Sequence, residues 1–489
     1  MRLLEFLCDV GIFNKGINMV KRTLSSDQFL KDIQGKNLNF LIGAGASVGL
    51  VNTLDLSELG ESFEDLYSDK ELNSQQRTAL DLIWFKSWIQ DTLITKEKIK
   101  GLLKNNPNGQ RTYGNYTDFV NELGDFLNRE GYDRPKRANI FTTNYDSLFE
   151  LAFDEVSQNQ RMIYFNDGSR GFLNRYISTE NFNLNISHSA MSDNFQRNIP
   201  TINLLKIHGS ITWDLEEDSK RIKATINNQV FQKVKTDSDI IFNHINLNNY
   251  PIIGHLFFEK DLKSGQKVNK EFIQEYLKKE LLEFKPKYPT ILSCSTDNNL
   301  PMSENPKPLT QEEASELEDR LQAEFNLHFN KWEDPQPIPI QKNNGNSDLE
   351  CSLNDFEMDY KRLQVVNPTK DKFRETVFQQ NYYQLLRMLS FELEKRDSIL
   401  IVFGFSFADE HILEIIRRSI INPYLKVFVI CYDESSRENI KNKLGNVGPN
   451  QVDFLPYDYN YVIDGQKQSK KGNFDYLNYL FSGRSNSEE

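Results

Sequence analysis

Leu38-Asn39-Phe40-Leu41-Ile42-Gly43-Ala44-Gly45-Ala46-Ser47 is the stretch that decides the fold. Residues 38–42 are a short apolar run that predicts a strand, and a glycine-rich turn follows the run directly. Glycine has no Cβ, so backbone N–H groups in such a turn can approach an anion at a helix N-terminus. The stretch predicts the strand and turn of a nucleotide-binding α/β unit, and a tight structural turn is the alternative.

Further short apolar runs lie between segments with helical spacing. After the first strand, we expect helices that include residues 148–151, 382–393 and 409–420. Alternation of this kind predicts a doubly wound parallel sheet, which is a Rossmann-like α/β fold. The other expected strands are residues 139–143, 204–207, 399–403, 426–432 and 452–455.

Two helices are predicted near the first strand. Ser25-Ser26-Asp27 can cap a short helix that Gly35 is well placed to end. Thr117 is predicted to cap a second helix, whose apolar face contains Phe119, Val120, Leu123, Phe126 and Leu127.

The pattern also predicts how the chain is divided. We expect an N-terminal extension at residues 1–24, of which the first 18 are either a dispensable extension or the result of an upstream start-site choice, and a core that begins at residue 25. The first part of the core, residues 25–213, contains a helical insertion at about residues 54–135. Residues 214–366 form an inserted mixed module that includes a helix at 310–332. Residues 367–481 complete the core, and residues 482–489 are a disordered tail.

Composition limits the function classes. The chain has 489 residues, with 58 basic and 70 acidic side chains and a formal charge of -12, which disfavours a surface that tracks nucleic-acid phosphates. Apolar runs such as residues 398–407 are far shorter than the roughly 20 residues of a membrane-spanning helix. The four cysteines, Cys8, Cys294, Cys351 and Cys431, form no C-x-x-C pair, so we expect no metal site and a reducing, cytoplasmic location.

Polar residues follow the predicted strands at their carboxyl ends, where parallel sheets bind ligands. His208 is a candidate general base because the pKa of histidine is normally near neutrality, and a structural histidine is the alternative. Asn144 and Asp146 are candidates to bind ribose hydroxyls and a water, or to form a turn with their own backbone. Ser406 is a candidate ribose or phosphate contact or a helix cap, and capping is equally open for Asp409.

Taken together, four motifs resemble the catalytic domain of sirtuins (SIR2), in the same order and at strand ends. The motifs are the glycine turn, Thr142-Thr143-Asn144-Tyr145-Asp146, Lys206-Ile207-His208-Gly209-Ser210 and Gly404-Phe405-Ser406-Phe407. The branch most similar to this chain is the SIR2-like NADases of bacterial antiphage defence. Asn367-Pro368-Thr369-Lys370 and Phe407-Ala408-Asp409-Glu410-His411-Ile412 add to the likeness, which covers about residues 25–215 and 365–460.

This resemblance implies an enzyme that hydrolyses NAD⁺ to nicotinamide and ADP-ribose, with NAD as substrate and no metal. It implies catalytic roles for Asn144, His208 and Asp146. The residues implied to bind NAD are Gly43, Ala44, Gly45, Ser47, Thr143, Gly404, Ser406 and Asp433. The resemblance also implies a gated homo-oligomer, with an ATPase or another defence protein as a partner and with no direct binding of nucleic acid or membrane.

The sequence departs from the deacylase sirtuins in two places. Those enzymes carry a four-cysteine zinc module and a substrate loop after the glycine turn, whereas here Val48-Gly49-Leu50-Val51-Asn52 follows the turn and no cysteine quartet exists. A protein deacylase or ADP-ribosyltransferase is therefore the weaker expectation. Two further functions stay open, namely a module that senses NAD or an ADP-ribose-like signal, and a structural subunit.

Overall fold

A computed structural model of the chain describes residues 24–51, 81–159, 162–189, 196–216, 221–244, 353–367, 380–445, 448, 451–463, 466–469 and 471–483, apart from residues 83, 132, 133 and 135. The predicted N-terminal extension up to residue 23, the predicted helix at 310–332 and the tail from residue 484 lie outside the described residues. These three predictions stay as predictions.

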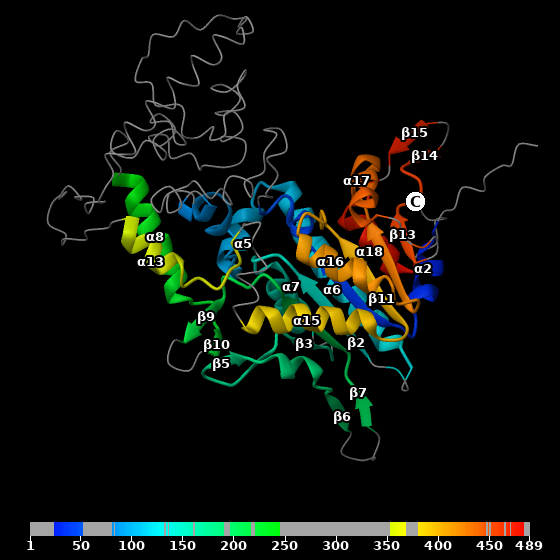
Figure 1. Cartoon of the computed structure of the whole chain (residues 1–489), viewed down its shortest axis with the longest axis horizontal. Helices are drawn as coiled ribbons and strands as arrows, with labels where there is room; N and C mark the ends of the chain where they lie inside the picture. Colours follow the sequence, from blue (N-terminus) through cyan, green and yellow to red (C-terminus); the bar gives the residue numbers. More distant parts are fainter. Residues whose placement is uncertain are drawn as a thin grey trace, which may run out of the picture.

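A seven-stranded parallel sheet forms the centre of the molecule, with the strand order β13-β12-β11-β1-β2-β8-β3 (Figure 1). The chain runs from β1 to β2 on one side and later returns through β11 on the other side. The crevice between β1 and β11 is therefore the point where the strand order reverses, which is where open α/β sheets bind ligands. The sheet confirms the predicted Rossmann-like α/β fold. The strands are β1 (Asn37–Ile42), β2 (Arg137–Thr142), β3 (Tyr164–Asn166), β8 (Thr201–Lys206), β11 (Ser398–Phe403), β12 (Leu425–Ile430) and β13 (Val452–Leu455).

Helices cover both faces of this sheet, because side chains along each strand point alternately to one face and the other. Phe40 of β1 belongs to the core on one face, and Leu41 belongs to the core on the other. The first face is covered by α2 (Ser26–Ile33), α6 (Pro107–Arg129), α7 (Leu148–Gln158) and α18 (Phe474–Ser482). The second face is covered by α15 (Gln380–Glu394), which crosses it in Figure 1, α16 (Glu410–Ser419) and α17 (Glu434–Leu444).

The two predicted helix starts have different outcomes. Ser25 is the N-cap of α2, within the predicted capping segment Ser25-Ser26-Asp27, and its side chain accepts a hydrogen bond from Gln28 N. Thr117 is not a cap, because α6 begins ten residues earlier at Pro107 and is capped by Asn106. Proline at the first turn of a helix has no N–H to leave unsatisfied, and the Asn106 side chain accepts from Gly109 N. Thr117 instead donates back to Tyr113 O inside the helix.

A second, antiparallel sheet of four strands has the order β4-β5-β10-β9. Its strands come from both sides of the predicted boundary at residue 213, so the described part of the 214–366 module pairs with the core. The division into domains otherwise stays a prediction. The strands are β4 (Ser169–Arg170), β5 (Arg175–Ile177), β9 (Trp213–Glu216) and β10 (Arg221–Ala224). The remaining elements are η2 (Ala44–Ser47), η4 (Phe85–Ile89), α5 (Lys96–Leu103), η5 (Thr179–Asn183), the hairpin β6 (Ser187–Ser189) and β7 (Gln196–Asn198), α8 (Gln229–His244), α13 (Leu353–Tyr360), and the hairpin β14 (Asn460–Ile463) and β15 (Gln466–Ser469).

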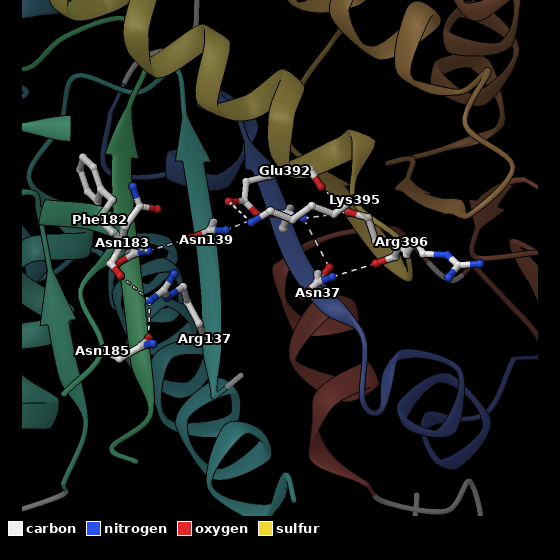
Figure 2. Close-up of polar contacts among 12 residues, drawn as sticks. Asn37, Arg137, Asn139, Phe182, Asn183, Asn185, Glu392, Lys395 and Arg396 are labelled. Atoms are coloured by element: carbon white, nitrogen blue, oxygen red, sulfur yellow. Dashed lines mark hydrogen bonds and ion pairs between the residues drawn. The ribbon is translucent and has the colours of Figure 1, made fainter. Parts of the chain in front are cut away.

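A ladder of buried asparagines crosses the central sheet on the face that α15 covers. Each amide donates from Nδ2 to the Oδ1 of the next: Asn166 to Asn203 over 2.9 Å, Asn203 to Asn139 over 2.8 Å, and Asn139 to Asn39 over 2.9 Å. Asn39 Nδ2 then donates to Ser398 Oγ over 3.1 Å. Figure 2 shows Asn139 of this ladder and, on the same strand, Arg137, whose side chain is hydrogen-bonded to Asn185. The ladder ties five parallel strands together in one register.

Candidate active site

The carboxyl ends of four parallel strands form one edge of the sheet. Ile42 of β1 pairs with Thr142 of β2 and with Phe403 of β11, and Thr142 pairs with Lys206 of β8. These are the last residues of their strands, so the segments that follow them lie at the same edge. The fold thereby brings the glycine turn, Asn144, His208 and Gly404 to the ligand-binding edge of the sheet.

The glycines of the turn pack against a third glycine. A Cβ placed on Gly43 would lie 2.5 Å from Gly404 O, and one placed on Gly45 would lie 2.8 Å from Gly404 Cα. Gly45 N donates to Gly404 O over 2.9 Å, and Gly43 N donates to Phe403 O over 3.0 Å. These glycines are thus required by the close backbone packing of the β1 and β11 turns. Gly404 itself has φ +64°, a conformation that glycine adopts without strain.

Ser47 is the centre of a buried hydrogen-bond network. Its hydroxyl donates to Asp146 Oδ2 over 2.8 Å, and it accepts from Asn144 Nδ2 over 3.1 Å. The phenol oxygen of Tyr116, on α6, lies 2.8 Å from the same Oγ. A serine hydroxyl has one proton and two lone pairs, so these three contacts use its full capacity. Ser47, Asn144 and Asp146, all predicted site residues, are in direct contact.

The network sets the orientation of the Asn144 amide. An ionised Asp146 can only accept, so the Ser47 hydroxyl proton points to Asp146. Ser47 can then only accept from Asn144, and the Asn144 atom that faces it must be Nδ2. Asn144 Oδ1 therefore points away from Ser47. Within the part of the chain that the structure describes, this oxygen is buried and has no hydrogen-bond partner.

Burial and charge act in opposite directions on Asp146. Burial raises the pKa of the Asp146 carboxyl, and the nearby ammonium of Lys206 and the Ser47 hydrogen bond lower it. Burial, followed by the charge of Asp146, raises the pKa of Tyr116 well above its ordinary value. Tyr116 therefore stays protonated at neutral pH, and its hydroxyl donates a hydrogen bond to Ser47 Oγ.

His208 lies next to the carboxylate of Asp409, which belongs to the segment that follows strand β11. His208 Nε2 lies 3.0 Å from Asp409 Oδ2, and both side chains are buried. Asp409 is also the N-cap of α16, where its Oδ1 accepts from His411 N over 3.2 Å. A carboxylate at one ring nitrogen orients the imidazole and stabilises the positive charge that the ring gains on accepting a proton.

The other predicted site residues lie at the same edge with local contacts. Ala44 is exposed, and Thr143 N donates to Ile42 O over 3.2 Å. Ser406 is exposed, and its carbonyl accepts from Lys443 Nζ over 3.0 Å. Asp433 follows β12 and caps α17, where its Oδ1 accepts from Ser436 N over 2.8 Å. The backbone hydrogen bond from Ser436 lowers the pKa of Asp433.

Sequence reasoning assigned no role to Tyr116, and it considered Asp409 only as a helix cap. Asp409 is a cap, and its second oxygen contacts His208. Neither residue carries a local signal for these contacts, because Tyr116 lies on a helix 69 residues away from Ser47 and Asp409 lies on a different strand end from His208. Only the packing of the sheet and its helices brings them to the site.

Metal ligation and membrane insertion find no support in the described residues. No group of three or more His, Cys, Asp or Glu side chains is arranged there to hold a metal ion. Within the same residues, no helix is both long enough and apolar enough to span a membrane.

The central part of the site coincides with a known domain. Residues 138–246 match the SIR2-like domain. This match begins in β2 and includes Asn144, Asp146 and His208, whereas the glycine turn and Gly404 lie outside it. SIR2-like domains are in general NAD-dependent enzymes, so the match indicates an NAD-related function. A comparison of the whole chain with curated proteins gave no significant match.

Proposed function

We propose that this protein hydrolyses NAD⁺ at the nicotinamide-ribose bond. One observation carries the proposal: the buried Oδ1 of Asn144 is a hydrogen-bond acceptor without a partner among the described residues, at the same sheet edge as the His208-Asp409 pair. A buried acceptor without a partner costs about 1–3 kcal/mol, and a ligand hydroxyl or water that donates to it removes this cost. The SIR2-like match supports NAD as that ligand.

The reaction makes one bond and breaks one. The bond between ribose C1′ and the nicotinamide nitrogen breaks, and its electron pair neutralises the positive charge of the departing ring. Water forms the new bond to C1′ and gives its proton to His208, so that the products are nicotinamide, ADP-ribose and a proton. Asn144 Oδ1 holds the water or a ribose hydroxyl, and Asp409 stabilises the imidazolium.

The edge of the sheet offers a path for the rest of the substrate. In this proposal the diphosphate lies against the exposed backbone of Ala44 and Gly45 beside Gly43, Ser47 and Thr143. The adenosine half lies toward Gly404, Ser406 and Asp433. Because Ser47 Oγ and the amides of Gly43 and Gly45 already have partners, their contribution is to shape the turn.

The same proposal includes regulation. A free NADase would empty its own cell of NAD⁺, so we propose a cytoplasmic effector of antiphage defence that is held inactive until triggered. A homo-oligomer, with an ATPase or another defence protein as a partner, is the proposed assembly. Its support is the resemblance of the motifs described above to SIR2-like NADases.

The decisive test is NAD⁺ consumption with chromatography of the products, on wild type and His208→Ala at several protein concentrations. Nicotinamide and ADP-ribose that appear only with wild type would support the hydrolase. Binding of NAD⁺ without consumption at any concentration would instead favour a sensing module or a hydrolase that needs its activating partner. Consumption that requires an acyl-lysine peptide would favour a deacylase.

A further inference from the structure

Lys206 is a buried cation between the loop that carries Asn144 and the loop that carries His208. Only 3% of it is exposed, and it is the last residue of β8. Its Nζ donates to Asp146 O over 2.5 Å and to Ser210 Oγ over 3.3 Å, and it lies 2.7 Å from Glu150 Oε1. An ammonium group has three protons, so these three acceptors use all of its donors.

The three acceptors belong to different structural units. Asp146 lies in the loop that carries Asn144, Glu150 lies in the first turn of α7, and Ser210 lies two residues after His208. We propose that Lys206 is a positioning residue, which fixes the loop of Asn144 and the loop of His208 relative to each other. This inference rests on the proposed NAD⁺ hydrolysis.

Stability alone does not explain a lysine at this position. A buried ion pair is on balance no more stabilising than well-packed apolar side chains of similar volume, because both charges lose their hydration. A cation with three fixed acceptors does, however, impose one geometry on the groups around it. Misplacement of catalytic groups by about 1 Å costs on the order of 10²-fold in rate, so such a clamp matters most for turnover.

Lys206 also acts on the charge of Asp146. The groups that face Asp146 are Lys206 from β8, Glu150 from α7, Tyr116 from α6 and the hydroxyl of Ser47. Among these, Lys206 is the cation, and it favours the ionised carboxylate that orients Ser47 and Asn144. Removal of Lys206 raises the pKa of Asp146 and weakens this orientation at acid pH first.

The test compares Lys206→Met with Lys136→Met, which removes another buried lysine, at the opposite edge of the sheet, where its Nζ donates to Asn128 O over 2.9 Å. For Lys206→Met we expect kcat to fall about 10²-fold with little change in KM. We also expect the acid limb of the pH profile to move to higher pH. Lys136→Met is expected to keep the kcat and the pH profile of wild type.

A double variant separates positioning from folding. Lys206→Met with Glu150→Gln removes both charges, so we expect its melting temperature to recover toward that of wild type while kcat stays low. Recovery of kcat together with stability would show that Lys206 serves only the fold, and would overturn the inference.

Amide hydrogen exchange gives a readout that does not depend on activity. Lys206→Met is expected to raise exchange in residues 143–150 and 208–212, and Lys136→Met is not. Unchanged exchange in both loops would overturn the clamp. If the purified wild type consumes no NAD⁺ but the two variants differ in exchange as expected, the clamp stands independently of the proposed hydrolysis.

Discussion

Asn144 Nδ2 donates a hydrogen bond to Ser47 Oγ over 3.1 Å, and this one contact decides that Asn144 Oδ1 is the end of the amide that points away from Ser47. The direction of the bond follows from Asp146, because a carboxylate can only accept the Ser47 proton. In the proposed hydrolase, Asn144 Oδ1 accepts a hydrogen bond from a group of the ligand that can donate. A ribose hydroxyl and a water both meet this requirement.

Replacement of Asp146 by asparagine tests the direction of this network. In Asp146→Asn, the side-chain oxygen can still accept from Leu148 N, so the amide NH₂ faces Ser47. The Ser47 hydroxyl proton then no longer points to residue 146 and can be donated in a hydrogen bond to Asn144 Oδ1. The orientation of the Asn144 amide is therefore no longer defined. We expect NAD⁺ turnover to fall on the order of 10²-fold, as for loss of one oriented polar contact in an active site. Single-turnover kinetics would measure the effect, and a rate equal to wild type would refute the argument.

The same variant changes how stability depends on pH. Burial raises the pKa of Asp146 above its ordinary value of 3.8, so the fold favours the protonated carboxyl. This contribution is fully present below the unfolded-state pKa and is lost as pH rises through the folded-state pKa. Compared with wild type, Asp146→Asn should therefore gain unfolding free energy as the pH rises from about 4 toward neutrality. Urea unfolding at a series of pH values would show the difference, and a difference that shrinks with rising pH would contradict it.

Asp409→Asn tests the partner of His208. Asparagine caps helices about as well as aspartate does, so α16 keeps its start, while the negative charge beside the imidazole is lost. We expect kcat to fall by roughly 10²-fold or more, because the ring loses both its orientation and its counter-ion. As a control, Ser25→Ala removes the N-cap of α2 and should cost about 1 kcal/mol of stability with no loss of turnover. Equal kcat in Asp409→Asn and wild type would remove Asp409 from the mechanism.

Gly43→Ala tests the packing of the glycine turn. Its new methyl group would lie 2.5 Å from the backbone oxygen of Gly404, which can move only with its turn. We expect a loss of about 1–3 kcal/mol, as for overpacking in a core. Gly101→Ala is the matched control, because it lies within α5 and, apart from its own stretch of helix backbone, no atom of the described residues lies within 4 Å of its new methyl group. It should gain about 0.5–1 kcal/mol, and denaturant unfolding that ranks the two variants the other way would disprove the packing argument.

Asn139→Leu tests the asparagine ladder. This substitution keeps a similar volume but leaves Asn39 Oδ1 and Asn203 Nδ2 without their partner in the sheet. Each buried polar atom left unsatisfied costs about 1–3 kcal/mol, so we expect a marked drop in melting temperature. Asn37→Ala is the comparison, because Asn37 Nδ2 donates to Arg396 O in a solvent-exposed contact (Figure 2). A drop no larger in Asn139→Leu than in Asn37→Ala would count against a stabilising role for the ladder.

Most of the central fold could be predicted from local patterns. Apolar runs in the sequence correctly predicted strands β1, β2, β8, β11, β12 and β13. The edge strand β3 and the terminal helix α18 were not predicted. Strand β3 has three residues, too few to show an alternating pattern, and the start of α6 was misplaced because Asn106 and Pro107 were not recognised as its cap. The asparagines of the ladder also escaped notice, since isolated polar residues inside apolar strands show no pattern until the strands are aligned.

By itself, the sequence determined that parallel strands alternate with helices, and that Gly43, Asn144, His208 and Gly404 follow strands. In a parallel sheet those positions must share an edge, so residue order was enough to predict a common site. Only the tertiary structure decided which side chains touch: Tyr116 and Asp146 on Ser47, Asp409 on His208, and Lys206 between the two loops. These hydrogen bonds and ion pairs join residues that lie 60 to 201 positions apart in the sequence. The direction of each hydrogen bond depends on which partner has a proton to donate, and no local sequence pattern shows this.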